Sequence, residues 1–363
     1  MKTYYALCGG QTPLNRVVMA GSHDAGITGG KWYARTQKHD IKHQAKAGVR
    51  MFDLRIAAAT GSGSTGGVKN AELRAYHADG AAKSTETKTR FVQELGRSVA
   101  LDRSSIRMGA FGETLGDMLG QAKAFVEKHT TEFLILKFDK CLNWELVAEA
   151  CVTLLGNSIY KGGGNINKMT LDQLKGKVIC AFTPTGLTAI GNNFTAADGI
   201  VGITNLNGGP PWRDAYDGIQ YYGKGGTSLM GLRAKTENRK KQTKLMLAGI
   251  NSHPEAMGMM YWTTTGLLGS IKARNDRMWK ASQRVSLVRT WNNGLRASID
   301  SQLNGLQDPF DAGGALLKTF MPNFVMIDFA DSDKCDLILD LNTVGAQELA
   351  RVAKHDVELE DSL

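Results

Sequence analysis

The sequence predicts an α/β fold, a TIM-type (β/α)8 barrel, from three observations. Eight short apolar runs recur along the 363 residues, and stretches with the 3.6-residue periodicity of helices follow most of them. No proline-rich linker or block of charge divides the chain, so the strands belong to one domain. An enlarged segment separates the fifth and sixth strands. Two doubly wound domains are the alternative for the same alternation.

The predicted strands are short runs of apolar and β-branched residues. They are expected at residues 16–20, 49–56, 72–77, 132–138, 177–182, 218–222, 259–265 and 324–329. The fourth run, EFLILKF, is apolar almost throughout, which is typical of a strand buried on both faces. Helices are expected at the end of 31–46, over 114–128, 143–155, 229–247 and 278–303, and from residue 342. Residues 1–350 thus form the barrel, and 351–363 form an acidic tail that frays.

The enlarged segment covers residues 183–217. It is rich in Gly, Asn and Thr and contains Pro210-Pro211-Trp212, a composition that predicts irregular structure. Loops of this length in compact domains are usually functional or mobile.

Composition narrows the class of protein. The chain has 42% hydrophobic and 22% charged residues, and no apolar run is long enough to span a bilayer. No signal peptide precedes the first strand, so we expect a cytoplasmic protein or one exported by a signal-independent route. Five cysteines without C-x-x-C spacing give no sign of a zinc site or a redox dithiol.

The net charge of +9 favours an acidic partner, and residues 233–244 are the densest basic block. We expect peripheral contact with a phospholipid surface, preferably an anionic one, and no nucleic acid.

The polar residues at the strand ends carry the functional prediction. In a barrel, the carboxyl ends of all strands meet on one face, so these residues share one mouth. They are His23, Asp24, Asp53, Arg55, His77, Lys137 and Asp328. Two imidazoles can act as general base and acid, a guanidinium can stabilise charge on phosphate oxygens, and a carboxylate can fix an imidazole tautomer. The set indicates phosphoryl chemistry.

These residues belong to five segments of the sequence. They are GSHDAGIT, TQKHDIKHQAKAGVRMFDLRI, AYH, HTTEFLILKF and FVMIDF. Together they resemble the phosphatidylinositol-specific phospholipase C X-domain superfamily, densely over the first four strands and well at the last. Between residues 180 and 310 the resemblance is thin.

The resemblance implies a phosphodiesterase that cleaves phosphatidylinositol to diacylglycerol and a cyclic inositol phosphate, which water can later open. His23 would be the general base that deprotonates the inositol 2-hydroxyl, with Asp328 bonded to it. His77 with Asp24 would protonate the leaving oxygen of diacylglycerol.

The resemblance also bears on the metal. Calcium-dependent members bind the ion with an Asn or acid after the first His and with carboxylates on strands two and four. Arg55 in FDLR and Lys137 stand where acids would be needed, and two fixed cations can replace the charge of calcium. We therefore expect the metal-independent bacterial type, with no cofactor. Calcium dependence is the alternative, as is a solvated strand-end role for Lys137.

Other roles follow from the same resemblance. Arg55 would contact the phosphate, and Asp53 would hold Arg55 or His77 in place. Asp217 and Tyr222, beside the sixth strand, are loosely matched partners for substrate hydroxyls, together with Lys137.

The head group is less well specified than the phosphodiester. The segment CAFTPTG lacks the basic residue with which the metal-independent enzymes grip inositol. A phosphodiesterase acting on another glycerophospholipid or on a glycerophosphodiester, such as a toxin, is therefore a second hypothesis. A lipid-binding barrel without activity is the third.

Aromatic residues near the mouth suggest how the protein contacts a lipid surface. Trp32 and Tyr33 follow the loop of His23, and Trp212 and Trp262 lie in or near other rim segments. Such side chains can seat in a lipid interface, and basic neighbours favour anionic lipid. Packing inside the protein is an equal alternative for each of them.

Overall fold

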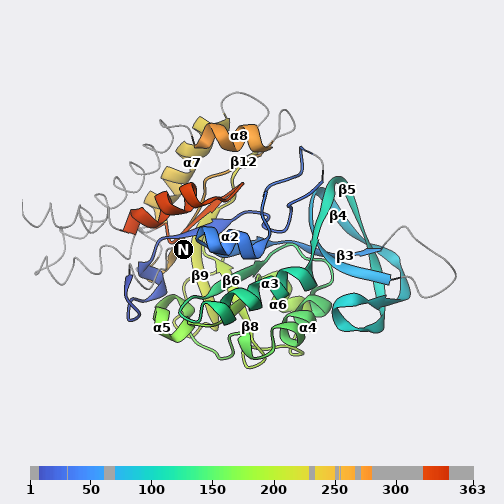
Figure 1. Ribbon diagram of the computed structural model, residues 1–363. Coiled ribbons are helices and arrows are strands. Elements are labelled where there is room, and N and C mark those ends of the chain that lie inside the picture. The colour runs from blue at the N-terminus through green and yellow to red at the C-terminus, as the bar shows by residue number, and fades with distance from the viewer. Residues whose placement is uncertain are drawn as a thin grey trace, which may run out of the picture.

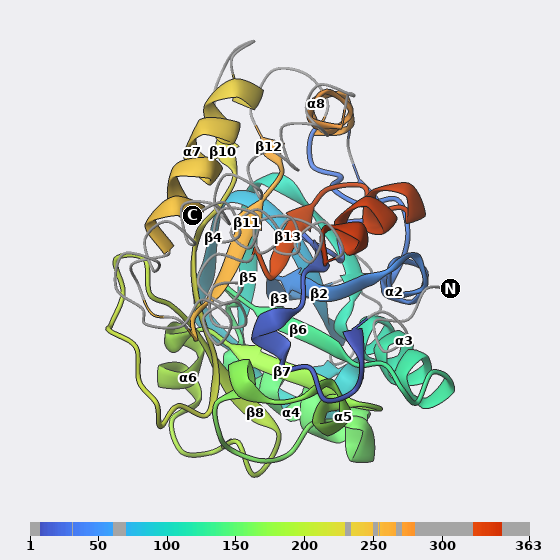
Figure 2. The same ribbon diagram turned by 90° about the vertical axis from the view of Figure 1, so that its left-hand side faces the viewer.

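In the computed structural model, eight parallel strands close into a barrel, which confirms the predicted fold class (Figure 1, Figure 2). The structure describes residues 8–30, 32–60, 70–228, 234–249, 253, 255–265, 271–279 and 322–342. Around the barrel the strands follow the order β1-β13-β11-β9-β8-β7-β6-β2. Their bounds are β1 Met19–Ser22, β2 Val49–Leu54, β6 Leu134–Phe138, β7 Val178–Phe182, β8 Ile200–Asn205, β9 Gly218–Lys224, β11 Met257–Tyr261 and β13 Phe324–Ile327.

Side chains along each strand alternate between two separate cores. One core includes Met19, Met51, Ile135, Ile179, Val201, Ile219, Met257, Met259, Phe324 and Met326. The neighbours of these residues in the strands, such as Phe52, Leu136 and Val325, join a second core with the surrounding helices. We assign the first core to the barrel interior, because it draws every second residue from all eight strands.

Helix α2 has a cap at each end. The Asp40 side chain accepts from His43 N at the start of α2, and Gly48 ends this helix with a φ of 127°. The bounds are α2 Ile41–Ala47, α3 Leu115–Lys128, α4 Trp144–Leu155, α5 Leu171–Leu174, α6 Pro184–Ile190, α7 Ala234–Gly249 and α8 Ile271–Met278. Short 3-10 turns lie at Leu14–Arg16, Gln93–Leu95, Gly156–Ser158 and Ile166–Lys168. Within the described ranges, none of the helices has the length and apolar character needed to cross a membrane.

Some predicted elements lie beyond the described residues. The helix expected over 278–303 overlaps them only at residues 278 and 279. The helix expected after residue 342 and the acidic tail at 351–363 lie outside them.

The predicted third barrel strand, 72–77, is wrong, because these residues belong to a separate antiparallel sheet. This sheet consists of β3 (Ile56–Thr60), β4 (Asn70–Val92) and β5 (Arg97–Thr114), and it lies to one side of the barrel in Figure 1. In the barrel, β2 pairs directly with β6. The apolar alternation of ELRAYH identifies a half-buried strand but does not specify its sheet.

The missing barrel strand is β8, inside the segment that we expected to be irregular. Residues 183–217 contain α6 as well as β8, which pairs with β7 and β9. The sequence IVGITN has a glycine and an asparagine, which weaken its strand signal. Gly202 is required there, because a Cβ would collide with the side chain of Tyr216. A further two-stranded sheet pairs β10 (Thr227–Ser228) with β12 (Thr264–Thr265).

Candidate active site

Polar side chains replace apolar ones at the carboxyl ends of four barrel strands. His23 and Asp328 directly follow β1 and β13, whereas Asp53 and Lys137 lie near the ends of β2 and β6. Neighbouring strands hold them in register, since Ser22 pairs with Ile327 and Asp53 pairs with Lys137. All four are buried. The alternation that fills the barrel floor with apolar residues thus also brings these groups to one mouth.

His23 and Asp328 form a buried pair. The Nδ1 atom of His23 lies 2.9 Å from Oδ1 of Asp328, whose side chain is fully buried. Burial alone would lower the pKa of His23, but the carboxylates of Asp24 and Asp328 raise it to about 9. With Nδ1 facing Asp328, Nε2 is the ring nitrogen available for proton transfer to a substrate. The pair therefore has the geometry of an oriented general base.

Asp24 connects three basic side chains. Its Oδ1 lies 2.9 Å from Nε of Arg55, while its Oδ2 lies 3.0 Å from Arg55 Nη2 and 2.6 Å from His77 Nδ1. Nε2 of His23 lies 3.6 Å from the same Oδ2. Burial alone would raise the pKa of the Asp24 carboxyl, but the charge of Arg55, with the two histidines, holds it well below its usual range. Asp24 is therefore ionised and fixes Arg55 beside His77.

Three residues at the mouth adopt left-handed backbone angles that only glycine adopts easily. The φ values are 44° for Asp24, 53° for Lys140 and 48° for Phe329. Asp24 itself belongs to the cluster, and Lys140 and Phe329 directly follow Asp139 and Asp328. Backbone strain of this kind is common at functional sites. Here it redirects the chain at the carboxyl ends of three strands.

His77 reaches the mouth from β4, outside the barrel. The backbone N of Tyr76 donates to the carbonyl of Arg55 at 2.9 Å, which ties the antiparallel sheet to the end of β2. The His77 side chain is 20% exposed, more than that of His23, which is 10% exposed. The sheet thus supplies an imidazole that our interpretation placed on a barrel strand.

Asp53 contacts neither Arg55 nor His77 directly; it binds Lys137 and Tyr261. Lys137 Nζ lies 2.8 Å from Asp53 Oδ1 and 3.4 Å from Asp139 Oδ2. Tyr261 OH donates to Asp53 Oδ2 at 3.2 Å. Burial alone would lower the pKa of Lys137, but Asp53 holds it well above its ordinary value. The direct partner of the Asp53 carboxylate is therefore a buried lysine, while its predicted role toward Arg55 or His77 stays a prediction.

The two remaining predicted contacts do not join the cluster. Asp217 precedes β9 at its amino end, where its carboxylate accepts from Gly164 N at 2.6 Å. Because the strands are parallel, this is the end of the barrel opposite the histidines. Tyr221 belongs to the interior core, so its neighbour Tyr222 faces away from the interior. Tyr221, not Tyr222, therefore faces the interior beneath the mouth.

The sequence interpretation missed Tyr261, Tyr221 and Asp139. Tyr261 stands two residues beyond the inward-facing Met259, so strand alternation would have found it. Tyr221 could be found only by knowing which residues of β9 face the barrel interior. Asp139 follows β6 directly, and its pKa, which burial alone would raise, is lowered by Lys137.

The rim aromatics differ in their surroundings. Trp32 is 60% exposed, and its ring meets Tyr33 edge-on with centroids 5.6 Å apart. Trp262 is buried beneath the helices, and Trp212 stacks on His253 at 4.2 Å. Among these tryptophans, Trp32 is the one that presents a largely exposed side chain.

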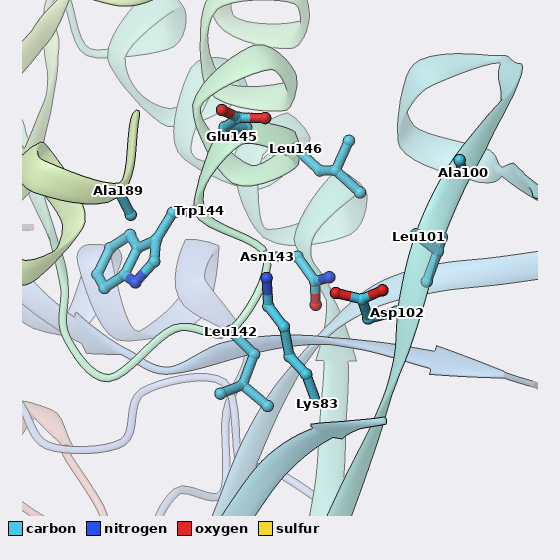
Figure 3. A pocket seen from close by; sticks show the side chains of 10 residues that line it. All are labelled: Lys83, Ala100, Leu101, Asp102, Leu142, Asn143, Trp144, Glu145, Leu146 and Ala189. Carbon is cyan, nitrogen blue, oxygen red and sulfur yellow. The ribbon is translucent and has the colours of Figure 1, made fainter. Parts of the chain in front are cut away.

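A separate cavity of about 350 Å³ lies between the hairpin of β4 and β5 and the start of α4 (Figure 3). Lys83 points toward Asn143, the residue before α4, and Asp102 and Glu145 also line the cavity. No member of the histidine cluster lines it. One cation and two carboxylates do not make an anion site, so we place no phosphate chemistry there.

Comparisons with known proteins find a match in structure only. No protein-family model and no curated protein matches the sequence. The phosphatidylinositol-specific phospholipase C from Listeria monocytogenes is 12% identical, with a TM-score of 0.51 over 92% of this chain and 95% of that one. A phosphatidylinositol-specific phospholipase C from Staphylococcus aureus is 15% identical, with a TM-score of 0.51 over 94% and 97%. The fold of this chain is therefore that of bacterial phosphatidylinositol-specific phospholipases C.

Proposed function

We propose that the protein is a phospholipase C-like phosphodiesterase that works by general acid–base catalysis. The observation that carries this proposal is the pairing of two imidazoles with two carboxylates around one guanidinium. His23 is held by Asp328, and Asp24 holds both His77 and Arg55. The shared fold with bacterial phospholipases C supports the same class of reaction.

In the proposed reaction, a substrate hydroxyl attacks the neighbouring phosphodiester. His23 takes the proton of that hydroxyl as the new oxygen–phosphorus bond forms, and His77 protonates the leaving oxygen as the old bond breaks. Arg55 stabilises the charge on the nonbridging oxygens. With phosphatidylinositol the products are diacylglycerol and a cyclic inositol phosphate. Water can then open the ring with the two imidazoles in exchanged roles.

Phosphatidylinositol is the proposed substrate, with Lys137 and Tyr221 at the floor beneath its head group. One observation favours a substrate with a head group other than inositol. Ala181 occupies the interior position of β7, where a basic residue would grip inositol. Another glycerophospholipid or a glycerophosphodiester is therefore the second candidate. The fixed imidazoles argue against a lipid-binding barrel without activity.

Metal independence is part of the proposal, and the carboxylates near the histidines support it. Asp24 faces Arg55, while Asp53 and Asp139 face Lys137. A calcium ion would have to displace these fixed cations to gain oxygen ligands. Within the described residues, no group of three or more His, Cys, Asp or Glu side chains could hold a metal ion. The donor set does not fit calcium, and no catalytic step is assigned to a metal.

We propose that the protein binds its substrate at a membrane surface. The charge of +9 and the exposed Trp32 support peripheral contact with anionic phospholipid. Nucleic acid is not a proposed partner.

The test is phosphorus NMR of phosphatidylinositol vesicles incubated with the protein and EDTA. A cyclic inositol phosphate signal is the expected result. Loss of activity in EDTA and its return with calcium would overturn the metal-independent mechanism. Cleavage of phosphatidylcholine or a glycerophosphodiester but not of phosphatidylinositol would assign the second substrate class, and cleavage of none would overturn the activity.

A further inference from the structure

A buried dipeptide, Thr36-Gln37, lies between the two loops that carry the His23–Asp328 pair. Both residues are fully buried, although both side chains are polar. Burial of an amide is costly unless its hydrogen bonds are satisfied. Both N–H groups and the oxygen of the Gln37 side chain bond backbone groups, so these partners define what the side chain does.

The Gln37 amide spans the ends of β1 and β13. Its Nε2 donates to the carbonyl of His23 at 2.9 Å and to that of Ile327 at 3.1 Å. Its Oε1 accepts from Ala330 N at 3.0 Å. These partners are His23 itself and residues on both sides of Asp328. One rigid planar group therefore links the backbones on which the imidazole and its carboxylate stand.

Thr36 completes the link from its own backbone and hydroxyl. Its Oγ1 donates to the carbonyl of Asp24 at 2.8 Å, and its carbonyl accepts from Phe329 N at 2.8 Å. Asp24 and Phe329 are the two residues with left-handed angles that follow His23 and Asp328. The dipeptide thus holds both strained turns at once.

We propose that Gln37 is a positioning residue that sets the separation of His23 from Asp328 through their backbones. This inference rests on the proposed function for its effect on rate, but the geometry of the pair can be measured without any activity. The ladder bond from His23 N to Ile327 O, at 3.0 Å, fixes the strands beneath the pair. Gln37 provides the corresponding link at the level of the two loops.

The imidazole offers a direct readout of this separation. The carboxylates of Asp24, Asp328 and Asp53 raise the pKa of His23 to about 9 against the effect of burial. Other groups near the ring are Tyr261, which meets it edge-on, and His77 and Arg55, which share Asp24. A longer Nδ1–Oδ1 distance would weaken the attraction of Asp328 for the imidazolium, so the pKa of His23 would fall.

The experiment compares Gln37→Leu with Gln220→Leu. Gln220 is a matched control because it is also buried and bridges backbone, accepting from Arg213 N at 2.9 Å and donating to Arg213 O at 2.7 Å. NMR titration of the histidine rings, with His23→Ala to assign the signal, gives the pKa in each variant. Urea unfolding gives the stability of each, which both substitutions should lower.

We expect Q37L to move the pKa of His23 toward its ordinary value of about 6.5 and Q220L to leave it unchanged. Turnover of the proposed substrate, compared at a pH above the pKa of His23 where the imidazole is neutral in both proteins, should fall about 10- to 100-fold in Q37L, with a smaller change in KM, because small misplacements of reacting groups cost rate. An unchanged pKa in Q37L, or an equal fall in both variants, overturns the positioning role. If Q37L does not fold, Gln37→Asn, whose shorter amide loses the same reach, is measured against the same control. A shifted pKa in Q37L, together with no turnover by the unsubstituted protein, would uphold the positioning role and overturn the proposed function.

Discussion

Asp24 shows how one carboxylate can organise two catalytic groups. Its two oxygens are shared between the Arg55 guanidinium and the ring of His77, and the left-handed angle of its backbone turns it toward both. A neutral side chain at this position would leave the half-buried guanidinium of Arg55 without its counter-charge. The site therefore depends on the charge of Asp24 as much as on the two imidazoles.

The first prediction concerns the two histidines. His23→Ala and His77→Ala should each lower the turnover number on phosphatidylinositol by at least about 10²-fold, since each removes one of two proton transfers. His43→Ala is the matched control, because the His43 side chain is 59% exposed and bonds only its own helix cap, Asp40. Full activity in either of the first two variants would remove that residue from the mechanism.

The second prediction is the pH dependence. The proposed base must be neutral, so kcat/KM should rise with pH up to the raised pKa of His23, about 9. Asp328 stabilises the protonated ring, so Asp328→Asn should lower this pKa and move the rising limb toward lower pH. The profile is measured over pH 5 to 10 in both proteins. A limb that stays in place would show that His23 is not the titrating base.

At the scale of elements, one buried ion pair joins the amino ends of β2 and β6, at the end of the barrel opposite the mouth. The guanidinium of Arg50, in β2, lies 2.9 Å from Glu132, just before β6, and both side chains are fully buried. It also donates to carbonyls of Ala45 and Val49 and lies over the ring of Phe125 in α3. The contact therefore joins α2, α3 and the two strands that present Asp53 and Lys137.

The third prediction follows from this burial. Glu132→Gln should lower the free energy of unfolding by about 3 kcal/mol, because it leaves a buried guanidinium without its counter-charge. Glu149→Gln is the control, since it removes the bidentate partner of Arg97 at the surface, where such pairs contribute about 0–1 kcal/mol. Urea unfolding measures both. Equal small losses would mean that the buried charge is compensated by other groups.

The antiparallel sheet is the other element that decides the site. It lies outside the barrel, yet β4 delivers His77 to Asp24. The link from Tyr76 N to Arg55 O makes the end of β2 the anchor of the sheet. A strand with the apolar pattern of a barrel member thus serves as an extra wall.

For the whole molecule, the fourth prediction concerns the membrane. Trp32→Ala should weaken binding to anionic phospholipid vesicles by about tenfold or more, since burial of a large apolar side chain contributes roughly 1.5–3 kcal/mol. Trp212→Ala is the control, because that ring is stacked on His253. Co-sedimentation with anionic and neutral vesicles measures both. Vesicle binding that changes neither with lipid charge nor with the Trp32→Ala substitution would contradict the proposed membrane-contacting surface.

The sequence by itself determined the barrel and most of the candidate mouth. Strand alternation is a local property, so MAGSH, MFDLR and FVMID place His23, Asp53 and Asp328 on interior positions without any knowledge of their partners. These predictions succeeded where the physics extends over only a few residues.

Only the tertiary structure decided which strands close the barrel and which groups pair. ELRAYH and IVGITN are both compatible with a strand, and the choice between them depends on contacts with residues far away in the chain. The phase of β9, which places Tyr221 inside and Asp217 at the far end, is set by its neighbours. Asp53 binds Lys137, which is 84 positions away in the sequence. Gln37 bonds Ile327 and Ala330, which are 290 and 293 positions away. Such pairings belong to long-range packing, which no local pattern encodes.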